Sequence, residues 1–185
     1  SRALGFVAGF TGREIVSELE KLGVQSEFIT IDSGVSRINV KLKSVDGTEI
    51  NGRGPDIDGK SLDKLMDKLD GLENGDVLFL SGSIPECVPD DIYSRIMAML
   101  NGRGITVVVD ATRELLMNVL EYRPFLIKPN NHELGEIFGV ELSSRAEVVP
   151  YARALQKKGA VNVLVSMAGE GAVLLAGDGH CLLYT

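Results

Sequence analysis

The chain has 185 residues, of which 44% are hydrophobic and 24% are charged, a balance typical of a folded domain rather than a disordered or fibrous chain. Nineteen lysine and arginine residues against 26 aspartate and glutamate residues give a net charge of −7, which argues against nucleic acid as the main partner. No apolar run approaches the roughly 18–20 residues of a membrane span. Two cysteines cannot build a disulfide framework, so we expect a cytoplasmic protein without a membrane partner.

In the first 70 residues, strand patterns and helix patterns alternate. A short apolar run over 4–8 precedes a helical pattern over 13–22. Phe28 to Ile31 indicates a strand, and the strict alternation of Arg37 to Lys43 indicates another, followed by the hairpin-turn sequence Val45-Asp46-Gly47. An amphipathic helix is predicted by its apolar positions, which are Leu62, Leu65, Met66 and Leu69.

The remainder of the chain repeats a strand followed by a helix. Apolar strands are predicted over 77–80, 105–109, 125–127 and 161–165. Helices are predicted over 90–100, 113–120 and 145–158, with one more beginning at Asn130 or Asn131. The last two apolar runs flank Gly177-Asp178-Gly179 and are typical of an antiparallel hairpin.

Continuous apolar strands separated by helices favour a doubly wound α/β fold, in which a mostly parallel sheet is covered by helices on both faces. Residues 26–51 hold strands with no helix between them, and we expect them to form a small β-sheet lid. The expected domains are an α/β core over 1–25 and 52–185 and a lid over 26–51. Because the chain opens on a strand and stops on another at Thr185, we expect the fold to be incomplete at both ends.

Ligands collect at the carboxyl ends of the strands in open parallel sheets. The residues that follow the predicted strands are small, hydroxyl-bearing or charged, and comprise Ser81-Gly82-Ser83, Asp110, Lys128 to Glu133 and Ser166 to Gly171. This composition is typical of a site for a phosphorylated ligand more than of a hydrophobic pocket.

The strand over 37–43 has two chemically different faces. Side chains alternate along a strand, so one face carries Arg37, Asn39, Lys41 and Lys43. Three cations and an amide spaced about 7 Å apart can grip a phosphate and a sugar hydroxyl. The alternative is a solvated edge strand whose lysines prevent aggregation.

Ser81-Gly82-Ser83 stands where the strand over 77–80 ends. Glycine lets the backbone approach a ligand closely, and the two hydroxyls can donate hydrogen bonds to a sugar or a phosphate. The same residues also fit a plain turn ahead of the next helix, so the motif leaves both interpretations open.

Lys128-Pro129-Asn130, with Glu133 three residues later, also has two interpretations. An asparagine N-cap followed by a glutamate at this spacing is a capping box. In a functional interpretation, the lysine is a phosphate partner, and Asn130 and Glu133 are outer-sphere ligands of Mg²⁺, which retains its waters. Spacing alone favours the cap.

Two glycine-bearing turns give weaker indications. Ser166 to Gly171 can lie against a nucleotide phosphate or ribose, although most such turns only connect strands. Gly9-Phe10-Thr11-Gly12, interpreted as a loop, lacks the full dinucleotide-binding pattern G-x-G-x-x-G, and no Walker A sequence is present. Cys87 is interpreted as a bystander, because no histidine in its segment could activate it.

Taken in order, these blocks resemble the ribokinase-like carbohydrate kinases of the phosphofructokinase-B type. The matching blocks span nearly the whole chain and are 5–12, 36–41, 81–85, Asp110, 128–133 and 166–172. The resemblance implies transfer of the γ-phosphate of ATP to a sugar phosphate, here fructose 1-phosphate, giving fructose 1,6-bisphosphate. Tagatose 6-phosphate and fructose 6-phosphate are the alternative substrates, and a non-catalytic nucleotide- or sugar-phosphate-binding module is the alternative class.

The resemblance also implies roles for individual residues. Those expected to bind the sugar phosphate are Arg37, Asn39 and Lys41 from the lid and Ser81, Gly82 and Ser83 from the turn. Those expected to contact ATP are Lys128, Asn130, Ser166, Gly169 and Gly171. Asn130 and Glu133 would order the waters of Mg²⁺, and the lid would pair between subunits and make a homodimer.

The sequence departs from the family at several places. The amino-terminal sugar-binding block does not occur, nor does the Gly-Ala-Gly-Asp block that supplies the anion hole and the general base. Because phosphoryl transfer depends on positioning and charge stabilisation, we expect these 185 residues alone not to turn over, with the base beyond Thr185. Asp110 is not the counterpart of that base, and Ala168 stands where glycine is usual.

Overall fold

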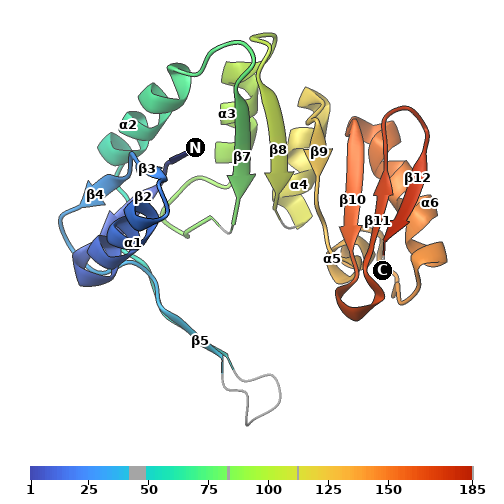
Figure 1. The fold of residues 1–185 in the computed structure, drawn as a ribbon, viewed down its shortest axis with the longest axis horizontal. Coiled ribbons are helices and arrows are strands. Elements are labelled where there is room, and N and C mark those ends of the chain that lie inside the picture. The colour runs from blue at the N-terminus through green and yellow to red at the C-terminus, as the bar shows by residue number, and fades with distance from the viewer. Residues whose placement is uncertain (42–48, 83, 112, 185) are drawn as a thin grey trace. The chain divides into compact units, whose positions relative to one another are not determined.

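The structure is a computed structural model that describes residues 1–41, 49–82, 84–111 and 113–184. The chain divides into two compact units, Ser1–Leu69 with Pro85–Val88 and Asp70–Ile84 with Pro89–Thr185. Figure 1 labels their helices and strands. Both units combine strands with helices, and the α/β class predicted from the sequence is confirmed.

The first unit contains two pairs of short parallel strands. Strand β1 (Arg2–Ala3) pairs with β3 (Gln25–Ser26), and β2 (Phe6–Ala8) pairs with β4 (Ile29–Ile31). Helix α1 (Gly9–Lys21) makes the crossover from β2 to β3, and α2 (Gly59–Asp70) follows later in the chain. The core of the unit is apolar and consists of Ala8, Ile29 and Ile31, with Phe6 and Leu65 packed against it.

Helix α1 begins at Gly9, four residues before the predicted start at residue 13, so the prediction of a loop there is wrong. Gly9 has φ +59°, and a Cβ at this position would lie 2.7 Å from the carbonyl oxygen of Gly34. Buried Ser36 completes the contact, because its hydroxyl accepts a hydrogen bond of 2.9 Å from the Ala8 N–H. Contacts between residues about 25 positions apart therefore set this helix boundary, and helical periodicity alone does not contain them.

Strands β5 (Asn39–Lys41) and β6 (Glu49–Asn51) form an antiparallel pair within the expected lid. Asn39 lies opposite Asn51, and Val40 lies opposite Ile50. Ile38, Val40 and Ile50 are exposed. The turn predicted at Val45-Asp46-Gly47 lies outside the described residues, and the lid boundaries stay a prediction.

The second unit is built on a six-stranded sheet with the strand order β12-β11-β10-β9-β8-β7. Its parallel strands are β7 (Val77–Ser81), β8 (Thr106–Asp110), β9 (Leu126–Ile127) and β10 (Asn162–Ser166). The antiparallel strands that follow are β11 (Ala172–Leu175) and β12 (Cys181–Tyr184), which confirms the predicted hairpin. The sheet is thus parallel where strands alternate with helices, and antiparallel at its carboxyl-terminal end.

Helices connect the parallel strands of the second unit. They are α3 (Ile92–Leu100), α4 (Arg113–Val119) with the short turn η1 (Leu120–Tyr122), α5 (Asn131–Phe138) and α6 (Arg145–Lys158). All lie close to the regions predicted to be helical. Figure 1 shows them as coiled ribbons behind the strands.

Alternate residues of β7, β10 and β11 are buried in the core of the second unit, whereas β8 buries three consecutive valines. Val163 and Val165 of β10 are fully buried, and so are Val148 and Leu155 of α6, which packs on that strand. Burying one such side chain stabilises the fold by roughly 1.5–3 kcal/mol. The apolar periodicity that predicted these elements therefore also identifies the buried contact between them.

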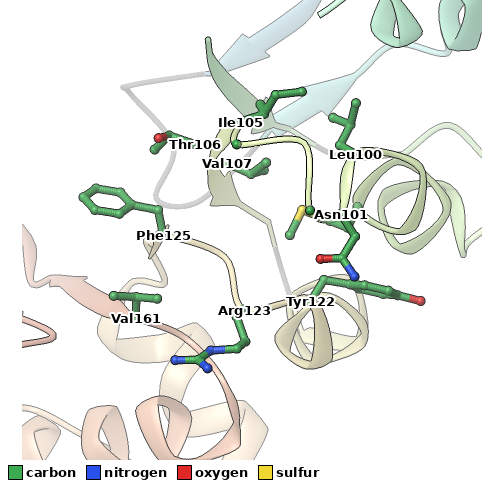
Figure 2. A pocket seen from close by; sticks show the side chains of 12 residues that line it. Leu100, Asn101, Ile105, Thr106, Val107, Tyr122, Arg123, Phe125 and Val161 are labelled. Carbon is green, nitrogen blue, oxygen red and sulfur yellow. The ribbon is translucent and has the colours of Figure 1, made fainter. Parts of the chain in front are cut away.

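The amino-terminal ends of β8, β9 and β10 surround a pocket of about 370 Å³ (Figure 2). Its apolar lining includes Leu100, Ile105, Val107, Phe125 and Val161. Parallel strands run from this edge to the opposite one, where the sequence predicts a phosphorylated ligand. The pocket and the predicted site thus lie at opposite ends of the same strands.

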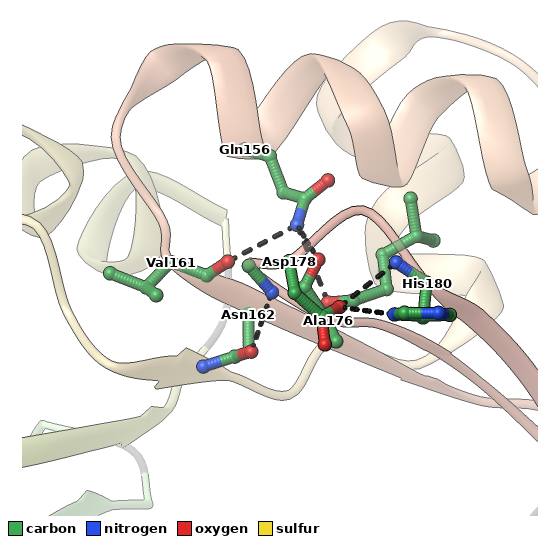
Figure 3. A network of polar contacts seen from close by, with 8 residues as sticks. Gln156, Val161, Asn162, Ala176, Asp178 and His180 are labelled. Atoms are coloured by element: carbon green, nitrogen blue, oxygen red, sulfur yellow. Dashed lines mark hydrogen bonds and ion pairs between the residues drawn. The ribbon is translucent and has the colours of Figure 1, made fainter.

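Polar side chains tie α6 to the last strands of the sheet (Figure 3). The Gln156 amide donates hydrogen bonds to the carbonyl oxygens of Val161 at 3.1 Å and Ala176 at 3.2 Å. The carbonyl oxygen of the Asn162 side chain accepts a hydrogen bond of 2.9 Å from the Gly177 N–H. These contacts join the turn between β11 and β12 to α6 through Gln156 and to β10 through Asn162.

We expect Gln156→Met to lower the free energy of unfolding by about 1–3 kcal/mol, because the backbone carbonyls lose their donor. Chemical denaturation with circular dichroism measures this difference. Lys157→Met is the matched control, since Lys157 is exposed on the same helix and its loss should change stability by no more than about 0.5 kcal/mol. Equal stability of the two variants would show that the Gln156 contacts contribute nothing.

Candidate functional site

Strand register brings several predicted site residues of the second unit to one edge of its sheet. Ser81 at the end of β7 lies opposite Asp110 at the end of β8, and Val109 lies opposite Ile127. One step further, Asn130 forms an isolated parallel bridge with Ser166 at the end of β10. The arrowheads of β7, β8 and β10 point to this same edge in Figure 1. The candidate site is therefore built from the carboxyl ends of adjacent parallel strands.

The turn after β7 is held on both sides of Gly82. The Gly82 N–H donates a hydrogen bond of 3.2 Å to the backbone carbonyl of Asp110, and the Tyr93 hydroxyl donates one of 3.3 Å to the Gly82 carbonyl. Burial, followed by the nearby charge of Asp110, raises the pKa of Tyr93 above its ordinary value, so its phenol stays a donor into more alkaline solution than a free tyrosine would. Ser81 is exposed beside this turn, and Ser83 lies outside the described residues.

Asp110 and Lys128 form an ion pair at the ends of neighbouring strands. The Asp110 Oδ2 lies 3.1 Å from the Lys128 Nζ, and each side chain is 40% exposed. The Lys128 N–H also donates a hydrogen bond of 3.0 Å to the Val109 carbonyl, which fixes the backbone under the lysine. The ammonium group is thus anchored on one side and open to solvent on another.

The predicted capping box at Asn130 and Glu133 is confirmed. The Asn130 side chain accepts a hydrogen bond of 2.9 Å from the Glu133 N–H, and Glu133 Oε2 accepts one of 2.8 Å from the Asn130 N–H. The other carboxylate oxygen of Glu133 has no partner among the residues that the structure describes. A rigid carboxylate with one oxygen still able to accept fits a magnesium ion that keeps its own waters.

The loop between β10 and β11 carries the remaining predicted contacts to a nucleotide. It contains the short helical turn η2 (Ala168–Glu170), and the Met167 N–H donates a hydrogen bond of 2.8 Å to the Gly171 carbonyl to close it. Ala168 has φ +46°, a left-handed conformation that favours glycine. A Cβ built on Gly169 would meet no atom within 4 Å, so this side of the loop is open.

The predicted lid residues belong to the first unit. Arg37 and Asn39 are both exposed. The side chain of Lys41 lies outside the described part of the chain. The approach of these residues to the Ser81 turn of the second unit stays a prediction.

Other candidate sites receive little support from the described residues. Within residues 1–41, 49–82, 84–111 and 113–184, no three histidine, cysteine, aspartate or glutamate side chains cluster in a way that could hold a metal ion directly. Among the same residues, every helix is too short or too polar to cross a bilayer. Cys87 and Cys181 are free thiols, and Cys87 accepts a hydrogen bond of 3.3 Å from the Ile57 N–H.

Sequence reasoning missed two features of this edge. The pairing of Asp110 with Lys128 was not predicted, although both residues directly follow predicted strands and adjacent strands would have placed them together. The role of Tyr93 in holding Gly82 has no sequence signal, because its position within a helical pattern does not show which loop it reaches.

Comparison of sequences identifies relatives of the chain. Residues 1–184 match the pfkB family of carbohydrate kinases. The chain is 44% identical over 178 residues to a 1-phosphofructokinase of Bacillus subtilis, covering 96% of this chain and 58% of that protein. It is 35% identical over 174 residues to a D-tagatose-1-phosphate kinase of Bacillus licheniformis, covering 94% of this chain and 57% of that protein. The chain thus spans somewhat more than half the length of these relatives.

Solved structures resemble the chain in fold. A Staphylococcus aureus structure provisionally named as a phosphofructokinase matches with a TM-score of 0.79 and 40% identity, over 95% of this chain and 57% of that chain. Phosphofructokinase-2 of Escherichia coli, solved with fructose 6-phosphate, matches with a TM-score of 0.85 and 24% identity, over 100% of this chain and 62% of that chain. The latter likeness supports the fold alone.

We expect Ala168→Gly to raise the free energy of unfolding by about 0.5–1 kcal/mol. Glycine removes a left-handed strain of about 1–2 kcal/mol, and the greater entropy of the unfolded glycine chain offsets about half of that gain. Thermal denaturation of the two proteins side by side measures the change. Ala154→Gly on helix α6 is the control and should lower stability, because that position is helical. Destabilisation by both changes would contradict a strained Ala168.

Proposed function

The chain belongs to the pfkB family of carbohydrate kinases, and from that premise we propose that it is part of an ATP-dependent kinase that converts fructose 1-phosphate into fructose 1,6-bisphosphate. The observation that carries this proposal is the row of strand ends in the second unit. Ser81, Asp110, Lys128 and Ser166 stand at one edge of the sheet, where open parallel sheets bind their ligands. Two hydroxyls, a cation and two turns with left-handed backbone, at Gly82 and Ala168, suit phosphorylated ligands better than apolar ones.

The names of the relatives support a substrate phosphorylated at carbon 1. Both 1-phosphofructokinase and D-tagatose-1-phosphate kinase act on ketohexose 1-phosphates according to those names. Fructose and tagatose differ only in configuration at carbon 4, so one set of cationic side chains that binds the phosphate at carbon 1 would serve either sugar. Tagatose 1-phosphate is therefore the second candidate substrate, in preference to the 6-phosphates that the sequence analysis gives as alternatives.

The chain supplies binding and orientation in this reaction. We assign the phosphate of the sugar to Arg37, Asn39 and Lys41, and its hydroxyls to Ser81, Gly82 and Ser83. Phosphoryl transfer needs little covalent help from a protein and depends on holding acceptor and donor in line. The rigid Gly82 turn supports that task, since its N–H and its carbonyl are both held by hydrogen bonds.

The nucleotide half of the proposed site lies along β9 and β10. Lys128 would contact the phosphates of ATP, together with Asn130, Ser166, Gly169 and Gly171 of the adjoining loops. Glu133 and Asn130 would orient waters of a magnesium ion, which neutralises phosphate charge when it is bound. The capping box makes these two side chains rigid, so little freedom is lost when they meet the hydrated ion.

The lid would also join two subunits. Val40 and Ile50 lie opposite each other in the strand register and are exposed, as is Ile38. Apolar side chains clustered on a two-stranded sheet favour burial against a second copy.

We place the protein in the cytoplasm, where its two free thiols suit a reducing environment.

A coupled assay with ATP and magnesium tests the proposed activity. We expect a longer polypeptide that contains this chain to form the bisphosphate from fructose 1-phosphate, and the 185 residues alone to show no turnover. Tagatose 1-phosphate, tagatose 6-phosphate and fructose 6-phosphate serve as comparison substrates. Equal rates of phosphorylation of the 1-phosphates and the 6-phosphates would refute the proposed binding of the phosphate at carbon 1.

We expect Arg37→Ala to weaken fructose 1-phosphate binding by about 1.5–3 kcal/mol, the range for a charged hydrogen bond, and to leave ATP affinity nearly unchanged. Isothermal titration calorimetry measures both affinities. Arg53→Ala is the matched control, because Arg53 is exposed in the same unit and its ion pair with Asp56 lies at the surface. An equal loss of affinity for ATP would count against a role of Arg37 in binding the sugar phosphate.

A further inference from the structure

Asp110 has no role in the binding contacts assigned above, although it forms an ion pair with Lys128, which we assign to ATP. The two paired atoms lie 3.1 Å apart on neighbouring parallel strands, at the edge where we place the nucleotide. Both side chains are partly shielded, since each is 40% exposed. The pair is partly open to solvent and contributes little to stability by itself, so what matters is where it holds the ammonium group.

A carboxylate partner can help Lys128 to bind phosphate by restricting its side chain. A lysine carries its charge on a flexible four-carbon stem, and fixing that stem costs about 2 kcal/mol of rotamer entropy. A carboxylate on the adjacent strand fixes the ammonium group before the ligand arrives. Two of the three ammonium protons stay available to phosphate oxygens while one faces Asp110.

Asp110 also contacts the other half of the proposed site. Its backbone carbonyl accepts the hydrogen bond of the Gly82 N–H at 3.2 Å. Gly82 has φ +99°, which glycine adopts readily, and this hydrogen bond joins its turn to Asp110. One residue therefore touches both the turn proposed for the sugar and the lysine proposed for the nucleotide.

We propose that Asp110 is a positioning residue whose carboxylate orients the Lys128 ammonium toward the phosphates of ATP while its backbone holds the Gly82 turn. This inference rests on the proposed function. It assigns the Asp110 side chain to nucleotide binding and the Asp110 backbone to support of the turn that is proposed to bind the sugar. A change of the side chain alone should therefore affect ATP and leave the sugar phosphate unaffected. The opposite expectation also has a physical basis, because a carboxylate beside Lys128 partly neutralises the charge that attracts phosphate.

Calorimetric titration of ATP into a longer polypeptide that contains this chain shows whether loss of the Asp110 carboxylate weakens or strengthens ATP binding. We expect Asp110→Asn, which keeps the size of the side chain, to raise the Kd for ATP about fivefold to twentyfold and to change the Kd for fructose 1-phosphate less than about twofold. Asp70→Asn is the matched control, since it breaks an ion pair of 2.8 Å with Arg103 in the same unit, ahead of the amino-terminal ends of β7 and β8. Tighter ATP binding by Asp110→Asn would overturn the proposal in favour of neutralisation.

A double-mutant cycle shows whether Asp110 acts through Lys128. In a Lys128→Met background, Asp110→Asn should have no further effect on ATP affinity, because the group that it positions is gone. Fully additive losses would overturn the proposal and indicate a general structural role. The proposed function fails separately if the wild-type protein binds ATP but phosphorylates no sugar phosphate, and the cycle remains informative in that case. Absence of ATP binding by the wild-type protein would refute both.

Discussion

Hydrogen bonds between neighbouring parallel strands place Ser81 opposite Asp110 and bring Lys128 and Ser166 to the same edge of the second unit. Every proposed contact in that unit depends on this register. A shift of one residue would turn each of these side chains to the other face of the sheet. The alternating buried valines of β10, Val163 and Val165, resist such a shift of that strand, because it would turn them out of the core. The stability of the core thus fixes the geometry of the site.

The positions of the strand ends could be predicted because apolar runs mark the strands and polar residues follow them directly. The capping box could be predicted for a similar reason, since Asn130 and Glu133 interact over three positions within one turn of helix. Its confirmation does not remove the proposed metal role, because one carboxylate oxygen of Glu133 remains able to accept. Interactions of this kind join residues that are close together in the sequence, so the sequence alone is enough to recognise them.

Contacts between distant residues could not be predicted in the same way. Helix α1 begins at Gly9 because of a close approach to Gly34, and periodicity contains no sign of that approach. Tyr93 reaches Gly82 across a loop of about ten residues, which a helical pattern does not reveal. The Asp110–Lys128 pair depends on the order of strands in the sheet as well as on their sequence. The resemblance to a kinase family indicated the function of these segments and left their mutual contacts unspecified.

A crystal structure of a longer polypeptide that contains this chain, with fructose 1-phosphate and a non-hydrolysable ATP analogue bound, would locate both ligands. We expect the nucleotide phosphates to lie within hydrogen-bond distance of Lys128 and the nucleotide to lie along the loop from Ser166 to Gly171. We expect the sugar phosphate beside the Gly82 turn. Ligands bound instead in the pocket of Leu100 and Phe125, at the opposite ends of the strands, would contradict a site at the carboxyl ends.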